Sequence, residues 1–112
     1  MFNPMELMGK LREVQAEMER VKLRLDEVIL TAETGGGMVK ATANANRKLL
    51  KIEVDPDIMD RSDKEMMEDL IVAAVNKVME EAENRSRDEI GKVSSGMLPN
   101  IPGFDPSKFG KG

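Results

Sequence analysis

The sequence predicts an α+β fold in which two long helices flank a three-stranded antiparallel sheet, in the order α-β-β-β-α. Three observations lead to this prediction. Apolar residues recur at spacings of four and three near the amino terminus, alternate with polar residues between positions 28 and 54, and return to helical spacing after position 62. With 112 residues, the chain is expected to form one domain.

The first helix is predicted from a dense start signal and a heptad pattern. Asn3 can cap the helix, Pro4 suits its first position, and Glu6 completes a capping-box arrangement, while Phe2 can contact Leu7. A helix of roughly 22 residues would be about 33 Å long. Its apolar seam is unbroken and consists of Leu7, Leu11, Val14, Met18, Val21, Leu25 and Val28.

The three strands follow as alternating segments separated by two turns. Gly35-Gly36-Gly37 forms the first turn and Asn44-Ala45-Asn46-Arg47 the second, where an asparagine is expected to adopt a positive φ. The triple glycine also invites comparison with a phosphate-binding loop. Such a loop ends in Lys-Ser or Lys-Thr and opens a helix, so a hairpin turn is the better interpretation. The strands therefore form a meander with one apolar face.

The second helix is predicted to begin at the capping box Ser62-Asp63-Lys64-Glu65 and to stop at Gly91. Residues 1–98 are expected to form the domain, and residues 99–112 a flexible tail rich in proline and glycine. The helix has one apolar stripe, made of Met67, Leu70, Ile71, Ala74, Val78 and Ala82 and widened by Met66, Val75 and Met79.

Composition excludes several classes of protein. The chain has no Cys, His, Trp or Tyr, so it offers no disulfide, no Cys/His zinc site and no His-based catalytic triad. The acidic segment 55–60 lacks the glycine and glutamate that a calcium-binding EF-hand loop needs. The paired carboxylates of the second helix fall on its polar face, where general acid–base catalysis is not expected. We therefore expect no enzymatic activity, cofactor, metal or small-molecule substrate.

Neither a membrane partner nor a secretory signal is expected. The first 30 residues carry charges throughout, and the longest strongly apolar run, Leu70–Val75, is too short to cross a bilayer. A second copy of the chain is the expected partner instead. One helix is enough to cover one face of a small sheet, so the other long amphipathic helix needs a further surface. Ten methionines and three phenylalanines also predict a lean, soft core.

Charge is distributed unevenly although the net charge is only −4. Residues 35–54 hold four basic side chains and one acidic, whereas residues 55–90 hold five basic and twelve acidic. The acidic balance argues against a strongly salt-driven nucleic-acid binder, and the lack of Trp, Tyr and His argues against stacking on single strands. Ordinary surface charge is the alternative interpretation of the basic residues.

Several segments resemble the YbaB/EbfC family of bacterial nucleoid-associated proteins. They are residues 33–42, residues 52–56, residues 63–76, and the tail segment Val93-Ser94-Ser95-Gly96-Met97 with Pro102-Gly103-Phe104 after it. The resemblance covers nearly the whole chain. It implies a tweezer-like homodimer that binds DNA in the cytoplasm, contributes to nucleoid organisation or gene regulation, and has no catalytic activity.

Candidate contacts to double-stranded DNA rest on charge position, because the family has no sharp contact motif to carry over. The helices are predicted to supply Arg12, Arg20, Lys22, Arg24, Arg85, Arg87 and Lys92. The alternative surface is the second turn with the strand after it, which offers Arg47, Lys48 and Lys51. The competing hypothesis for function is a protein-interaction scaffold in which the heptad seam recruits a partner and DNA contact is incidental.

Overall fold

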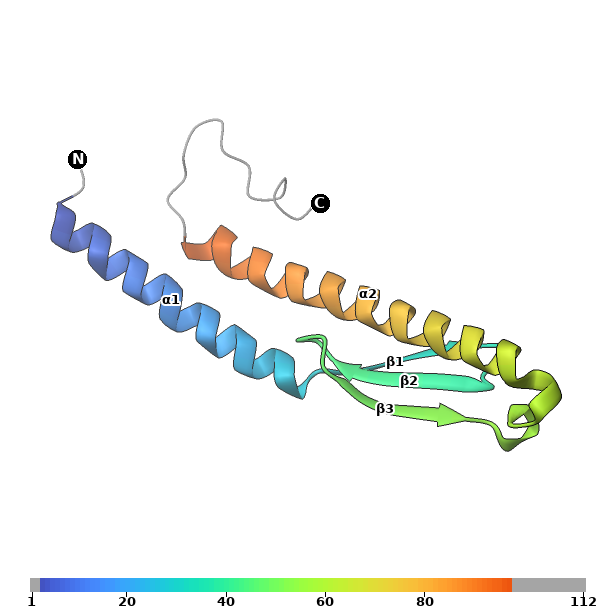
Figure 1. The fold of residues 1–112 in the computed structure, drawn as a ribbon. Coiled ribbons are helices and arrows are strands. Elements are labelled where there is room, and N and C mark those ends of the chain that lie inside the picture. Colours follow the sequence, from blue (N-terminus) through green and yellow to red (C-terminus); the bar gives the residue numbers. More distant parts are fainter. Residues whose placement is uncertain (1–2, 98–112) are drawn as a thin grey trace, which may run out of the picture.

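The computed structural model describes residues 3–97 and confirms the predicted order of elements (Figure 1). Two 3-10 turns, Pro56–Ile58 and Arg61–Asp63, connect the sheet to the second helix. The predicted contact of Phe2 and the predicted tail at 99–112 lie outside the described residues. The main elements are helix α1 (Pro4–Glu27), strands β1 (Ile29–Thr34), β2 (Val39–Asn44) and β3 (Leu49–Val54), and helix α2 (Lys64–Met97).

The helix ends agree with the sequence prediction at one site and differ at two. Asn3 caps α1 as predicted, and its side chain accepts a hydrogen bond of 3.0 Å from the Met5 N–H. Ser62 is not the cap of α2, because it lies inside a 3-10 turn that Asp60 caps. The predicted stop at Gly91 is also wrong, since α2 continues to Met97. Glycine costs a helix only about 1 kcal/mol relative to alanine, so tertiary packing can override it.

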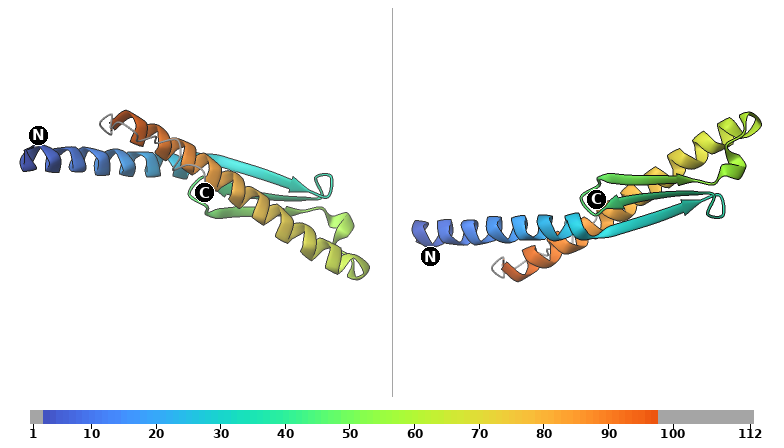
Figure 2. Two further views of the ribbon diagram at one scale, coloured as in Figure 1. Left: turned by 90° about the horizontal axis from the view of Figure 1, so that it is seen from above. Right: turned by 90° about the horizontal axis from the view of Figure 1, so that it is seen from below.

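The sheet has the order β1-β2-β3, and α2 covers one of its faces. Ala32 lies opposite Ala41, and Ala41 lies opposite Ile52, so these side chains share the face towards α2. The helix crosses that face, as the two views of Figure 2 show. Its residues Ala74 and Val78 are fully buried against the sheet. The predicted apolar stripe of α2 is thus core, although Met66, expected to widen it, is exposed.

The two turns use positive φ angles differently. Gly35, Gly36 and Gly37 all have positive φ, as a glycine turn predicts. In the second turn the residue with positive φ is Arg47, at 63°, and neither asparagine shares this conformation. The Asn44 side chain accepts from the backbone N–H groups of Asn46 and Lys48 at 3.0 and 3.1 Å, which holds the loop in this shape.

Beyond the sheet, α2 lies beside α1, and the molecule is elongated, with extents of 69 × 27 × 16 Å (Figure 1). Val21 and Leu25 of α1 pack with Ala45 and Val93 in a second apolar cluster. One chain thus covers the carboxyl-terminal part of the heptad seam by itself. The amino-terminal part remains uncovered among the described residues, with Leu7 49% and Leu11 56% exposed.

Candidate nucleic-acid interface

The cations of α1 do not share one face of the helix. Arg20 and Arg24 lie one turn apart and both contact Glu17, Arg24 at 3.8 Å. Lys22 lies two residues from each arginine, so its side chain leaves the helix on a different side. Glu19 and Lys22 have the same spacing as Glu17 and Arg20 but form no ion pair in residues 3–97. Within residues 3–97, Arg12 and Lys22 have no ion-pair partner.

The three candidate cations of α2, Arg85, Arg87 and Lys92, are each engaged by a carboxylate about one helical turn away. Glu89 contacts Arg85 at 3.7 Å and Lys92 at 3.4 Å, while Glu83 contacts Arg87 at 2.9 Å. All of these residues lie at or near the surface, where such pairs contribute a few tenths of a kcal/mol each. A phosphate could displace them, but only in competition with the carboxylates already in place.

The second turn is fastened to the end of α1. The Asn46 side-chain amide donates to the Lys22 carbonyl oxygen at 2.7 Å and to Asp26 Oδ1 at 2.6 Å. The Ala45 N–H donates to the carbonyl oxygens of Leu25 and Val28 at 3.2 and 3.0 Å. Four hydrogen bonds therefore hold the loop between β2 and β3 against the last turns of the helix.

This junction joins two segments whose cations the sequence predicts on separate surfaces. Arg47 and Lys48 follow Asn46 directly, and Asn46 contacts the backbone of Lys22. All three cationic residues are exposed, and none forms an ion pair with another residue of the range 3–97. We call Lys22, Arg47 and Lys48 the junction cluster. Lys51, the third residue of the predicted alternative surface, instead pairs with Glu53 at 3.2 Å.

Asn46 is the residue that sequence reasoning missed at this site. Its place in the second turn predicts only a turn former, because asparagine is frequent in turns. Nothing local in the sequence signals that its side chain would reach helix residues 20 and 24 positions away. The contact depends on where α1 and the hairpin meet, which the sheet register determines.

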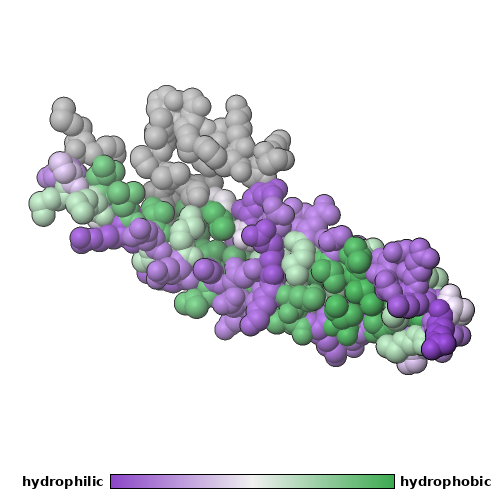
Figure 3. All heavy atoms as spheres, viewed as in Figure 1, coloured by the Kyte–Doolittle hydropathy of each residue, from purple (hydrophilic) through white to green (hydrophobic). Residues whose placement is uncertain are grey.

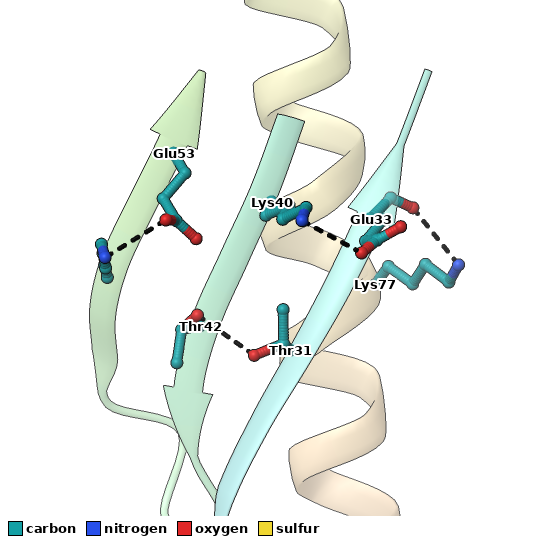
Figure 4. Close-up of polar contacts among 7 residues, drawn as sticks. Thr31, Glu33, Lys40, Thr42, Glu53 and Lys77 are labelled. Atoms are coloured by element: carbon teal, nitrogen blue, oxygen red, sulfur yellow. Dashed lines mark hydrogen bonds and ion pairs between the residues drawn. The ribbon is translucent and has the colours of Figure 1, made fainter. Parts of the chain in front are cut away.

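The open face of the sheet carries mixed charge and offers no basic platform (Figure 4). Thr31 and Thr42 share a hydrogen bond of 3.2 Å across β1 and β2. Glu33 contacts Lys40 at 3.6 Å, and its backbone carbonyl accepts from Lys77 at 3.4 Å. These cations are occupied within the chain, so the junction cluster remains the better candidate for anion contact.

The described range holds neither a cluster of metal ligands nor a membrane-spanning helix. No group of three or more His, Cys, Asp or Glu side chains in residues 3–97 is arranged to hold a metal ion. Among the described helices, none is both long enough and apolar enough to cross a membrane.

Comparison with known proteins shows close relatives along nearly the whole chain. A nucleoid-associated protein of Chlorobium phaeovibrioides is 42% identical over 93 residues, covering 83% of this chain and 84% of the relative. One from Thermoanaerobacter pseudethanolicus is 38% identical over 103 residues, covering 92% and 91%. The crystal structure of an uncharacterized protein from Helicobacter pylori has the same fold, with a TM-score of 0.76 at 23% identity over 88% of this chain and 100% of that one. Residues 1–97 match the YbaB/EbfC DNA-binding family, and the chain therefore belongs to this family of nucleoid-associated proteins.

Proposed function

We propose that the protein binds double-stranded DNA as a homodimer and contributes to nucleoid organisation or gene regulation in the bacterial cytoplasm. Membership of a DNA-binding family supports DNA as the partner. The observation that carries the site is the junction cluster: Arg47 and Lys48 follow Asn46, whose side chain bonds to the Lys22 backbone, and none of the three cations has an ion-pair partner in residues 3–97.

Phosphate contact is expected first at the junction cluster and second at the paired cations. A free lysine or arginine gains the whole attraction of a phosphate and releases condensed counterions from the duplex. A paired cation must first give up its carboxylate. Among the other candidates, Arg12 is likewise unpaired in the described range. The cations that already contact a carboxylate are the secondary contacts: Arg20, Arg24, Arg85, Arg87 and Lys92 on the helices.

A dimer carries the site twice, which doubles the number of phosphate contacts available to a chain whose net charge is −4. Two junction clusters supply six cations, and six phosphate contacts give a slope of log K against log salt of about −5. The acidic part of α2, which contains Glu80, Glu81 and Glu83, is expected to face away from the duplex. The exposed apolar residues Leu7 and Leu11 support association of the chain, since large exposed apolar surfaces mark interaction sites.

The test compares two double variants that each remove two cations. In Arg47→Gln with Lys48→Gln, affinity for a duplex of any sequence should fall, and the salt slope should shrink by about four because four contacts per dimer are lost. In the matched control, Arg20→Gln with Arg24→Gln, the slope should change by less, since both arginines share Glu17. Fluorescence anisotropy across a salt series measures both quantities.

An unchanged slope in the junction double variant, with the fold intact by circular dichroism, would contradict the proposed contact site. The second candidate function, a protein-interaction scaffold, is favoured by the net negative charge and by Met5 and Met8, which are 80% and 55% exposed on α1. Absence of duplex binding at about 50 mM salt, or a flat salt response, would support the scaffold over the DNA-binding function.

A further inference from the structure

Asp26 places a carboxylate in the last turn of α1, where the helix dipole disfavours negative charge. It also lies beside the junction cluster, because its Oδ1 accepts from the side chain of Asn46, which Arg47 and Lys48 follow directly. Figure 3 shows hydrophilic surface in the middle of the molecule, where α1 ends. An exposed carboxylate at this position opposes phosphate binding at the proposed site, since like charges repel.

The cation nearest to Asp26 along the helix does not pair with it. Lys22 lies four residues before Asp26, a spacing at which side chains share one side of a helix and often form an ion pair. Within residues 3–97, however, Lys22 forms no ion pair, and the side-chain contact of Asp26 is with Asn46. The carboxylate is therefore engaged by the loop between β2 and β3, and not by the lysine.

Both groups that Asn46 contacts on α1 accept hydrogen bonds and donate none. A backbone carbonyl and an ionised carboxylate leave the amide one suitable orientation, with its NH2 group towards the helix. Hydrogen bonds to an ionised acceptor are about twice as strong as neutral ones. The bond to Asp26, at 2.6 Å, is also slightly shorter than the bond to the Lys22 carbonyl oxygen, at 2.7 Å. Asp26 thus provides the stronger of the two side-chain links between Asn46 and the helix.

We propose that Asp26 is a positioning residue of the DNA site: it holds the β2–β3 turn against α1 through Asn46, while its negative charge limits the affinity of the junction cluster for phosphate. The inference rests on the proposed function and names the residue that sets how tightly this site binds DNA. The two effects oppose each other. Removing the charge while keeping an acceptor should strengthen DNA binding, whereas removing the acceptor as well should loosen the turn.

A first variant, Asp26→Asn, removes the charge and keeps an oxygen that can accept from Asn46. Each dimer loses two negative charges beside its junction clusters, so duplex affinity should rise about two- to tenfold at low salt. The gain should shrink as salt is added, because exposed charges are screened. The matched control is Glu27→Gln, at an exposed neighbour whose side chain has no hydrogen bond or ion pair in residues 3–97. Its gain should be smaller, because successive side chains leave a helix about 100° apart.

A second variant, Asp26→Ala, removes the same charge and also the acceptor. A difference in duplex affinity between the two variants therefore reports the link to Asn46 and not the charge. We expect Asp26→Ala to bind duplex about threefold or more weakly than Asp26→Asn does. Amide hydrogen exchange provides a measure that needs no DNA, through the Ala45 N–H that bonds to the Leu25 and Val28 carbonyl oxygens. It should exchange faster in Asp26→Ala than in Asp26→Asn, which should match the wild type.

A double-mutant cycle tests whether Asp26 acts through Asn46. In an Asn46→Ala background there is no amide for residue 26 to hold. Asp26→Asn and Asp26→Ala should then have equal affinity for duplex and equal exchange of the Ala45 N–H, because the coupling between the two positions is lost. A difference that persists in this background would overturn the positioning role through Asn46.

The outcomes separate this inference from the function on which it rests. Absence of duplex binding by the wild-type chain would overturn the proposed function and the inference together. A wild type that binds duplex as tightly as Asp26→Asn does would overturn the limit that the charge sets on affinity. Equal affinity and equal exchange in Asp26→Asn and Asp26→Ala would overturn the link through Asn46 and leave the DNA-binding function in place.

Discussion

Asn46 donates both hydrogens of its side-chain amide to α1, one to the Lys22 carbonyl oxygen at 2.7 Å and one to Asp26 Oδ1 at 2.6 Å. The contact joins residues that are 24 and 20 positions apart in the sequence. It fixes the loop that carries Arg47 and Lys48 against the helix that carries Lys22. The junction cluster therefore depends on an uncharged side chain that does not itself attract phosphate.

Asn46→Ala should destabilise the protein and weaken DNA binding together. The change removes two hydrogen bonds, one of them to a carboxylate, and should lower the free energy of unfolding by about 1–3 kcal/mol. Urea denaturation measures this, and anisotropy measures the loss of affinity. Asn84→Ala is the control, because Asn84 is exposed on α2 and alanine favours a helix. Equal stability of both variants would show that the amide contacts contribute nothing.

Arg47→Gly should separate stability from DNA binding. A non-glycine residue in the left-handed region costs roughly 1–2 kcal/mol, and Arg47 has a φ of 63°. Glycine removes that strain but gives the unfolded chain more freedom, so the free energy of unfolding should stay within about 1 kcal/mol of wild type. Duplex affinity should fall, because a phosphate contact is lost in each subunit. Unchanged affinity with unchanged stability would remove Arg47 from the proposed site.

Gly35→Ala should destabilise the chain more than Gly36→Ala does. Both glycines have positive φ, 62° and 67°, so both variants carry a similar backbone strain. A Cβ at Gly35 would lie 2.8 Å from Cδ1 of Leu70, whereas a Cβ at Gly36 meets no atom within 4 Å. Close by, the Thr34 hydroxyl donates to the Leu70 carbonyl oxygen at 2.7 Å, which limits how far the hairpin can shift. Thermal unfolding should rank wild type above Gly36→Ala, and Gly36→Ala above Gly35→Ala; a reversed order of the two variants would contradict the contact with Leu70.

Gly91→Ala should stabilise the protein by about 0.5–1 kcal/mol, because alanine is the better helix former. Position 91 lies inside α2, and a Cβ there meets nothing within 4 Å. Gly9→Ala in α1 is also free of clashes and should stabilise less, since that end of the helix is largely unpacked. Chemical denaturation compares the two. A loss of stability in Gly91→Ala would argue that the helix ends at Gly91 in solution.

The element order, the apolar face of the sheet and the cap at Asn3 can all be predicted from the sequence. Each of these features depends on residues close together in the chain, because the alternation of a strand and the cap of a helix both involve a single element. The glycine turn between β1 and β2 was predictable for the same reason, since three successive glycines permit positive φ. The family resemblance was readable at the same level, from contiguous segments such as residues 33–42 and 63–76.

The end of α2 and the ion-pairing of the cations depend instead on how distant elements pack. Helix α2 passes Gly91 because Val93 packs against Val21 and Leu25, an interaction between residues about 70 positions apart. The heptad seam predicts a continuous apolar face, but only its carboxyl-terminal part meets α2. Asn46 reaches α1 because the β2–β3 turn arrives there, and Lys22 thereby joins Arg47 and Lys48. A local pattern reports which side of an element is apolar or charged, whereas the partner on that side depends on how distant elements pack.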